Sequence, residues 1–213
     1  KNDEENIWWK RVQELARLGR KKSKGKYLVG MLDLHSNMDA LSAIRGAERL
    51  CMDIIDSPST VLKAIENIKR LYPDVYNRIY TLAGMEECGT IGWIPAYCKG
   101  KFAVTECDFA CMISKDDFKR FVLPALIEEW ELLDHTIYHF DGVNALHHMD
   151  TILSCTQIDA IQWVPGAGNK PQHEWIDLLK KIQSSGKAVE ITGVTPEQAK
   201  LLHKELKPNL VYY

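Results

Sequence analysis

Short runs of apolar residues recur along the chain, and most of them end in polar side chains. Such runs are typical of strands that are buried on both faces, as the strands of a parallel sheet are. They predict six strands, at residues 27–35, 102–106, 136–139, 160–164, 187–191 and 210–213. The runs from residue 102 onward are regularly spaced, whereas the first stands far ahead of the others.

Apolar positions at helical spacing separate these runs. They predict helices at residues 1–20, 39–55, 57–72, 73–83, 114–133, 143–155, 171–184 and 195–206. Ser114 and Thr195 have the residues of helix N-caps. Residues 84–101 are rich in glycine and predict an irregular loop that carries Trp93 and Tyr97. Long loops in compact domains are usually functional or mobile.

Strand and helix alternate from residue 102 with short connections, which predicts βαβ units and a parallel sheet. We therefore expect an α/β fold, with residues 1–213 forming a single domain. Six strands are fewer than the eight of a closed (β/α)8 (TIM) barrel. The chain is accordingly expected to be the C-terminal portion of an incomplete barrel, with roughly its last six strands. If the chain is complete, an open doubly wound sheet is the better interpretation.

Composition narrows the function classes. The chain has 213 residues, of which 46% are hydrophobic and 26% are charged, with a formal net charge of −2. This balance argues against a nucleic-acid partner, and no apolar run is long enough to cross a membrane. The six cysteines include no CxxC pair, which predicts reduced thiols and a cytoplasmic protein. A small-molecule substrate is expected, and the composition leaves open whether the protein forms a homo-oligomer.

Candidate chemistry centres on the stretch Tyr138-His139-Phe140-Asp141-Gly142, where a strand gives way to a turn. Residues i and i+2 of a strand project to the same side, so His139 and Asp141 can aim at one point. They could be two metal ligands or an acid/base pair. The alternative is a buried histidine that a nearby carboxylate orients, without any chemistry.

Other predicted strands also end in ionisable side chains. Asp33 and His35 end the first, Glu106 and Asp108 the second, and Glu190 lies on the fifth. Barrel enzymes place their working residues at such ends, and converging charges are costly unless paired, protonated or metal-bound. The predicted catalytic residues are Asp108, Glu106 and His35. Cys107 could be a ligand or nucleophile, although a lone buried cysteine is more often a small hydrophobe.

Several stretches resemble the uroporphyrinogen decarboxylase superfamily, and the resemblance covers residues 27–213. It is carried by Phe118–Pro124, Tyr138–Gly142 and Asp159–Gly166, with support from Arg45-Gly46, Asp56-Ser57-Pro58 and Ile113-Ser114. The chain is most similar to a poorly characterised bacterial subgroup. The resemblance implies a (β/α)8 barrel. The superfamily also contains zinc-dependent methyltransferases that act between corrinoid proteins and thiols.

Those methyltransferases bind zinc through His-x-Cys followed by glycine, which the resemblance places on His139 and Asp141. Their third ligand, a cysteine, has no counterpart here, and Glu190 is the substitute we expect. The preferred hypothesis is a metal-dependent methyltransferase, with zinc held by His139, Asp141 and Glu190 and a methyl-corrinoid protein as the donor.

Two alternatives remain open. One is decarboxylation of a tetrapyrrole, as in uroporphyrinogen decarboxylase. The family's arginines would precede this chain, its serine falls on Asp108, and its last histidine would follow Tyr213. The other is a non-catalytic barrel that binds a corrinoid or another small ligand.

Overall fold

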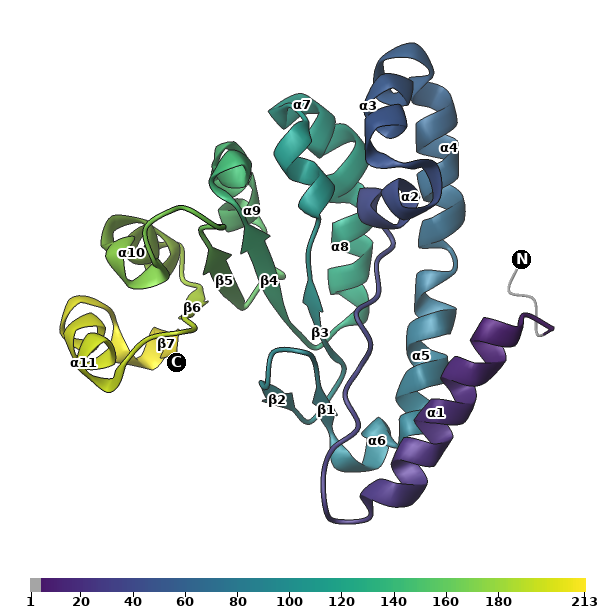
Figure 1. Cartoon of the computed structure of the whole chain (residues 1–213), viewed down its shortest axis with the longest axis horizontal. Coiled ribbons are helices and arrows are strands. Elements are labelled where there is room, and N and C mark those ends of the chain that lie inside the picture. Colours follow the sequence, from purple (N-terminus) through teal and green to yellow (C-terminus); the bar gives the residue numbers. More distant parts are fainter. Residues whose placement is uncertain (1–4) are drawn as a thin grey trace.

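The computed structural model describes residues 5–213, and its centre is a five-stranded parallel sheet (Figure 1). The strands follow the chain order without a reversal: β3 (Phe102–Thr105), β4 (His135–Asp141), β5 (Ala160–Val164), β6 (Ala188–Glu190) and β7 (Val211–Tyr212). The α/β class is therefore confirmed. A doubly wound sheet would reverse its strand order at a switch point, and this sheet does not.

Helical segments connect the strands and cover one face of the sheet (Figure 1). Between β3 and β4 lie η1 (Asp108–Met112), α7 (Lys115–Asp117), a π-helical turn η2 (Phe118–Val122) and α8 (Leu123–Leu132). Next come η3 (Val143–His148) and α9 (Met149–Ser154), then η4 (Gln172–Glu174) and α10 (Ile176–Ser184), then α11 (Pro196–Glu205) and η5 (Pro208–Leu210). Ser114 and Thr195 cap their helices as predicted.

The two faces of the sheet differ in chemistry. Tyr138, Phe140 and Trp163 belong to the main core on the helix-covered face. The other face carries a smaller cluster that includes Phe102, Val104 and Ile137. Ile94, from the segment that joins strands β1 (Thr90–Ile91) and β2 (Tyr97–Cys98) of a short hairpin, packs against this cluster. The segment predicted as an irregular loop thus contains a hairpin and also the helix α6 (Met85–Cys88).

Helices before the sheet form its N-terminal flank. They are α1 (Ile7–Ser23), α2 (Met38–Arg45), α3 (Ala47–Asp56), α4 (Pro58–Lys69) and α5 (Tyr72–Ala83). Residues 1–4 of the predicted first helix lie outside the described residues. The helix predicted at 39–55 is two helices, because Gly46 between them has a φ of 86°, outside the right-handed helical region. Among the described helices, none is long and apolar enough to cross a membrane.

The strand predicted at residues 27–35 was wrong. This segment is not part of either sheet, and Met31 N donates a hydrogen bond to Ile91 O at 2.7 Å. Val29 and Met31 pack instead on the cluster built around α5, while Leu28 and Leu32 stay exposed. An apolar run indicates burial, but a strand must also form a ladder of hydrogen bonds with a neighbouring strand. Here Val29 and Met31 are packed against α5 without such a ladder.

Candidate metal centre

The site lies where β3 and β4 end and where the 27–37 segment passes them. Thr105 pairs with Tyr138 in the parallel ladder, so Glu106, the next residue, lies beside His139. Asp108 follows two residues later, at the start of η1. Parallel strands present their carboxyl ends at one edge of a sheet, which brings residues distant in sequence together.

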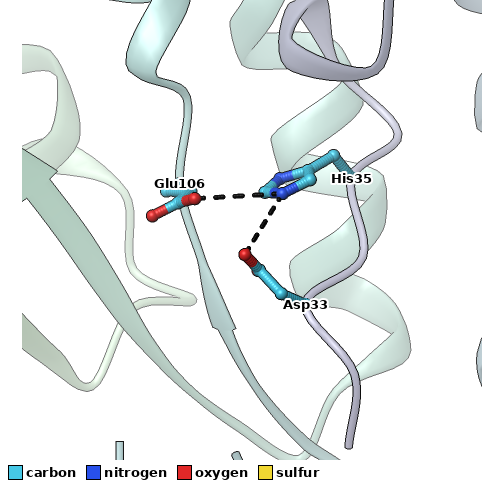
Figure 2. Close-up of side chains that lie close together, drawn as sticks. All are labelled: Asp33, His35 and Glu106. Atoms are coloured by element: carbon cyan, nitrogen blue, oxygen red, sulfur yellow. Dashed lines mark ion pairs between the residues drawn. The ribbon is translucent and has the colours of Figure 1, made fainter. Parts of the chain in front are cut away.

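Asp33, His35 and Glu106 form the first group of side chains (Figure 2). The Nε2 atom of His35 is 3.4 Å from Asp33 Oδ2 and 3.8 Å from Glu106 Oε1. The ligand atoms of the three residues all lie within 4.8 Å of one another. Glu106 is the most buried of the three and directly follows β3, whereas Asp33 and His35 come from the 27–37 segment, outside both sheets.

Glu106 also belongs to a second group, with Asp108 and His139. The Nε2 atom of His139 is 3.7 Å from Glu106 Oε2, the carboxylate oxygen that does not face His35. Ligand atoms of this group also lie within 4.8 Å of one another. Both groups can hold a metal ion, and each offers one imidazole nitrogen and two carboxylates.

A row of polar side chains across the sheet orients His139. His139 pairs with Gln162 on β5, which pairs with Glu190 on β6, so the three share one face. The Nδ1 atom of His139 is hydrogen-bonded to Gln162 Oε1, and Gln162 also hydrogen-bonds Glu190. If the Gln162 amide N–H donates to ionised Glu190, its oxygen must accept from His139 Nδ1–H. In the neutral ring this leaves the Nε2 lone pair facing Glu106, as a metal ligand requires.

The segment that carries His35 is fixed by a carboxylate on α8. Glu129 is 1% exposed, and its Oε1 accepts hydrogen bonds from Ser36 N at 2.7 Å and Ser36 Oγ at 2.5 Å. The neighbouring Asn37 donates from Nδ2 to Glu106 O at 2.8 Å. Side-chain hydrogen bonds thus hold the backbone of this segment in place, as ladder hydrogen bonds hold the backbones of the strands.

The backbone that carries Asp108 is fixed from α2. The carboxylate of Asp39 accepts hydrogen bonds from Asp108 N and Phe109 N, each at 2.8 Å. Asp39 follows the N-cap Asn37 and therefore links the unpaired segment to the loop after β3. Cys107 lies beside it, buried, and burial raises the pKa of its thiol well above the usual value, which favours the small-hydrophobe interpretation.

The electrostatics of the site reflect its surplus of carboxylates. Burial raises the pKa of Glu106 to about 7, and the charges of Asp33 and Asp108 add to this effect. Burial lowers the pKa of His35, but the hydrogen bond and charge of Asp33, with other nearby carboxylates, outweigh it and raise that pKa to about 9. Both shifts show a site that favours added positive charge, either a proton or a cation.

The structure brings together five candidate residues that the sequence singled out, namely Asp33, His35, Glu106, Asp108 and His139. It does not bring the predicted zinc set together, because neither Asp141 nor Glu190 joins a metal-ligating group among the described residues. Asp141 shares a side with His139, but two residues along a strand is a step of about 7 Å. Glu190 lies two strands from His139, which is about 10 Å, and Gln162 fills the gap.

Trp93 is a site residue whose role the sequence did not predict. Its ring meets that of His139 edge-on, with centroids 5.1 Å apart, and its side chain hydrogen-bonds Asp33. Its position in a long glycine-rich loop suggested that the loop is functional, but did not indicate what Trp93 does. The partnership of Gln162 with His139 depends on strand register, which the sequence did not specify. The case for the site rests on this geometry, since no protein-family model, curated protein or solved structure matches the chain.

Proposed function

We propose that this protein is a metal-dependent methyltransferase that moves a methyl group between a corrinoid protein and a thiol or similar acceptor. The observation that carries the proposal is the convergence of Glu106, Asp108 and His139 at the carboxyl ends of β3 and β4. The consecutive, all-parallel strand order supports the (β/α)8 barrel that the resemblance implies. In such barrels this edge carries the chemistry.

The donor set fits a divalent cation such as zinc. Imidazole nitrogen and carboxylate oxygen are both common zinc ligands, and catalytic zinc sites use three protein ligands with one open position. The set is harder than the thiolate ligands of the related methyltransferases, so Mn²⁺ and Fe²⁺ fit it as well. A bound cation here would act as a Lewis acid that lowers the pKa of a coordinated thiol.

The protein's own residues would hold and orient the acceptor. Glu106 and His139 are part-buried while Asp108 is exposed, so the group is accessible from solvent on one side. Trp93 stands next to His139 and offers an apolar wall to one side of a ligand. Gln162 keeps the His139 ring in one orientation. A donor carried by a partner protein can reach such an open site.

Decarboxylation of a tetrapyrrole is less well supported. A porphyrinogen substrate carries several carboxylates, and like charges repel most strongly where burial lowers the dielectric constant. The groups nearest the strand ends include Asp33, Asp39, Glu106 and Asp108, with His35 and His139 as the histidines between them. This arrangement suits a cation more than a polyanion.

The test begins with elemental analysis of the purified full chain and of the His139→Ala variant. We expect bound metal in the wild type and a loss of most of it in the variant. The metal-loaded protein is then mixed with methylcob(III)alamin and a series of thiols. Transfer yields cob(I)alamin, the methyl thioether and a proton, and cob(I)alamin is followed by its absorption spectrum. A wild-type protein without bound metal, or metal-loaded protein without transfer to any thiol, would overturn the proposal.

A further inference from the structure

The two oxygens of the Glu106 carboxylate face different histidines. Oε1 lies 3.8 Å from His35 Nε2, and Oε2 lies 3.7 Å from His139 Nε2. A carboxylate that presents one oxygen to each of two nitrogen donors is placed between two coordination sites. A single ion near either histidine would use only one of the oxygens.

The spacing within each group suits an ion of its own. Two ligands about 2.1 Å from a tetrahedral zinc ion lie about 3.4 Å apart. The Asp33 Oδ2 to His35 Nε2 distance is 3.4 Å, and the two Glu106 contacts are a few tenths of an ångström longer. Small side-chain rotations close that difference. Each group also supplies three ligand atoms, which leaves room for a substrate atom.

We propose that the site binds two divalent cations, with Glu106 as the carboxylate that bridges them. One cation lies between Asp33, His35 and Glu106, and the other between Glu106, Asp108 and His139. The cation between Glu106, Asp108 and His139 is the one on which the proposed function rests. The cation between Asp33, His35 and Glu106 is the new inference. Ions bridged in this way lie about 3.5–4 Å apart and together stabilise atoms of the reacting groups.

Charge balance supports a second cation. The three ligand carboxylates carry three negative charges, and Asp39, which accepts a hydrogen bond from Asp108 N, adds a fourth close by. One divalent cation leaves two of these charges unbalanced, whereas two cations balance all four. Each group supplies three ligand atoms, so both cations keep an open position, and the site suits acceptors that present one donor atom, such as a thiol sulfur, to both.

Both halves of the site are held by residues outside it. Glu129 fixes the backbone next to His35, Asp39 fixes the backbone of Asp108, and Gln162 orients His139. Such outer contacts are usual around metal ligands, and their loss typically weakens metal affinity 10- to 100-fold. The competing explanation is that His35 is simply a protonated partner of Asp33, and the experiment separates the two.

The experiment titrates the metal-free full chain with Co²⁺, measuring bound cobalt after gel filtration and the electron paramagnetic resonance of each sample. We expect saturation at two equivalents, with the signal per cobalt falling as the second equivalent binds, because a carboxylate bridge couples the spins. Saturation at one equivalent would overturn the second cation and leave the proposed function intact. No bound cobalt would overturn both.

Variants assign the two equivalents. Asp33→Asn and His35→Ala should each bind one cobalt and show an uncoupled signal, and Asp108→Asn should also retain one. If Asp33→Asn and His35→Ala still bind two coupled cobalt ions, the assignment is wrong. Circular dichroism shows that each variant is folded, and Asp33→Asn, which keeps the side-chain shape, carries the test if His35→Ala does not fold.

His135 offers a matched control on the same strand. It lies at the opposite end of β4, with its Nδ1 atom 3.2 Å from Asp159 Oδ1, and belongs to no three-residue group among the described side chains. A histidine with a single carboxylate partner does not make a site of this kind. His135→Ala should therefore still bind two coupled cobalt ions, and a loss of either would overturn the assignment to the Glu106 site.

Discussion

The ligands of the proposed site come from two regions that hold their backbones in different ways. The strand side is Glu106, Asp108 and His139. Glu106 and His139 are attached to a ladder in which Thr105 pairs with Tyr138 and His139 with Gln162, whereas the backbone of Asp108 is held by Asp39. The segment side, Asp33 and His35, belongs to a stretch outside both sheets. Ladder hydrogen bonds fix a backbone whatever its side chains are. The segment side depends on particular side chains, so single substitutions should affect it far more.

The largest effect is expected for Glu129→Ala, which removes the acceptor of Ser36 N and Ser36 Oγ. Leaving these buried groups unpaired beside a new cavity should cost about 4 kcal/mol of unfolding free energy at pH 5. Denaturant unfolding measures the loss. Hydrogen exchange should show opening of residues 33–37 and an unchanged β4. If both regions open equally, the segment side does not depend on this carboxylate.

The isosteric variant Glu129→Gln should instead become more stable relative to the wild type as the pH rises, because the wild type loses stability. Burial raises the pKa of Glu129 from 4.5 to about 7, so the folded state holds an extra proton between these values. Stability from this group is full below pH 4.5 and is lost as the pH rises toward 7. At 1.36 kcal/mol per pKa unit the loss is up to about 3 kcal/mol.

The glutamine keeps the acceptor for Ser36 and does not ionise, so the difference in unfolding free energy between Glu129→Gln and wild type should grow from pH 4.5 to 7. Above pH 7 it should stay constant. Denaturant unfolding of both proteins at several pH values measures this difference. A difference that does not change with pH would mean that Glu129 titrates near its ordinary value in the fold.

The contrast between the two sides also explains what the sequence could predict. The strands β3 to β7 and their helices follow from apolar periodicity, and the strand ends named Glu106, Asp108 and His139 as site residues. Periodicity says which residues are buried but not which strands pair, so the 27–35 run was mistaken for a strand. The spacing of the predicted zinc set depends on the same missing information. His139, Gln162 and Glu190 are neighbours only through strand register.

A smaller loss is expected for Asp39→Ala, since Asp39 connects the two sides by accepting from Asp108 N and Phe109 N. Water can replace part of these contacts because Asp108 is exposed, so the unfolding free energy should fall by about 2 kcal/mol. Denaturant unfolding measures it. The affinity for the cation held by Asp108 should fall about 10-fold or more. Asp53→Ala, at an exposed ion pair on α3, is the control and should change neither quantity noticeably.

The smallest effect is expected for Trp93→Phe, at the one aromatic ring described as touching both sides. Its side chain hydrogen-bonds Asp33 of the segment side, and its ring meets His139 of the strand side. Phenylalanine keeps an aromatic ring beside His139 and loses the indole N–H donor. The loss of one hydrogen bond to a charged group should lower the unfolding free energy by about 1 kcal/mol.

The Co²⁺ affinities of the Trp93→Phe variant distinguish the segment side from the strand side more clearly than its unfolding free energy does. The indole hydrogen bond helps to hold the Asp33 carboxylate in place, so its loss should weaken the binding of the cation between Asp33 and His35. The cation between Asp108 and His139 should keep its affinity. Co²⁺ titrations of the variant and of the wild type measure both affinities, with Trp8→Phe, on the exposed side of α1, as the control. Equal weakening of both cations would show that Trp93 supports the site as a whole and does not act through Asp33.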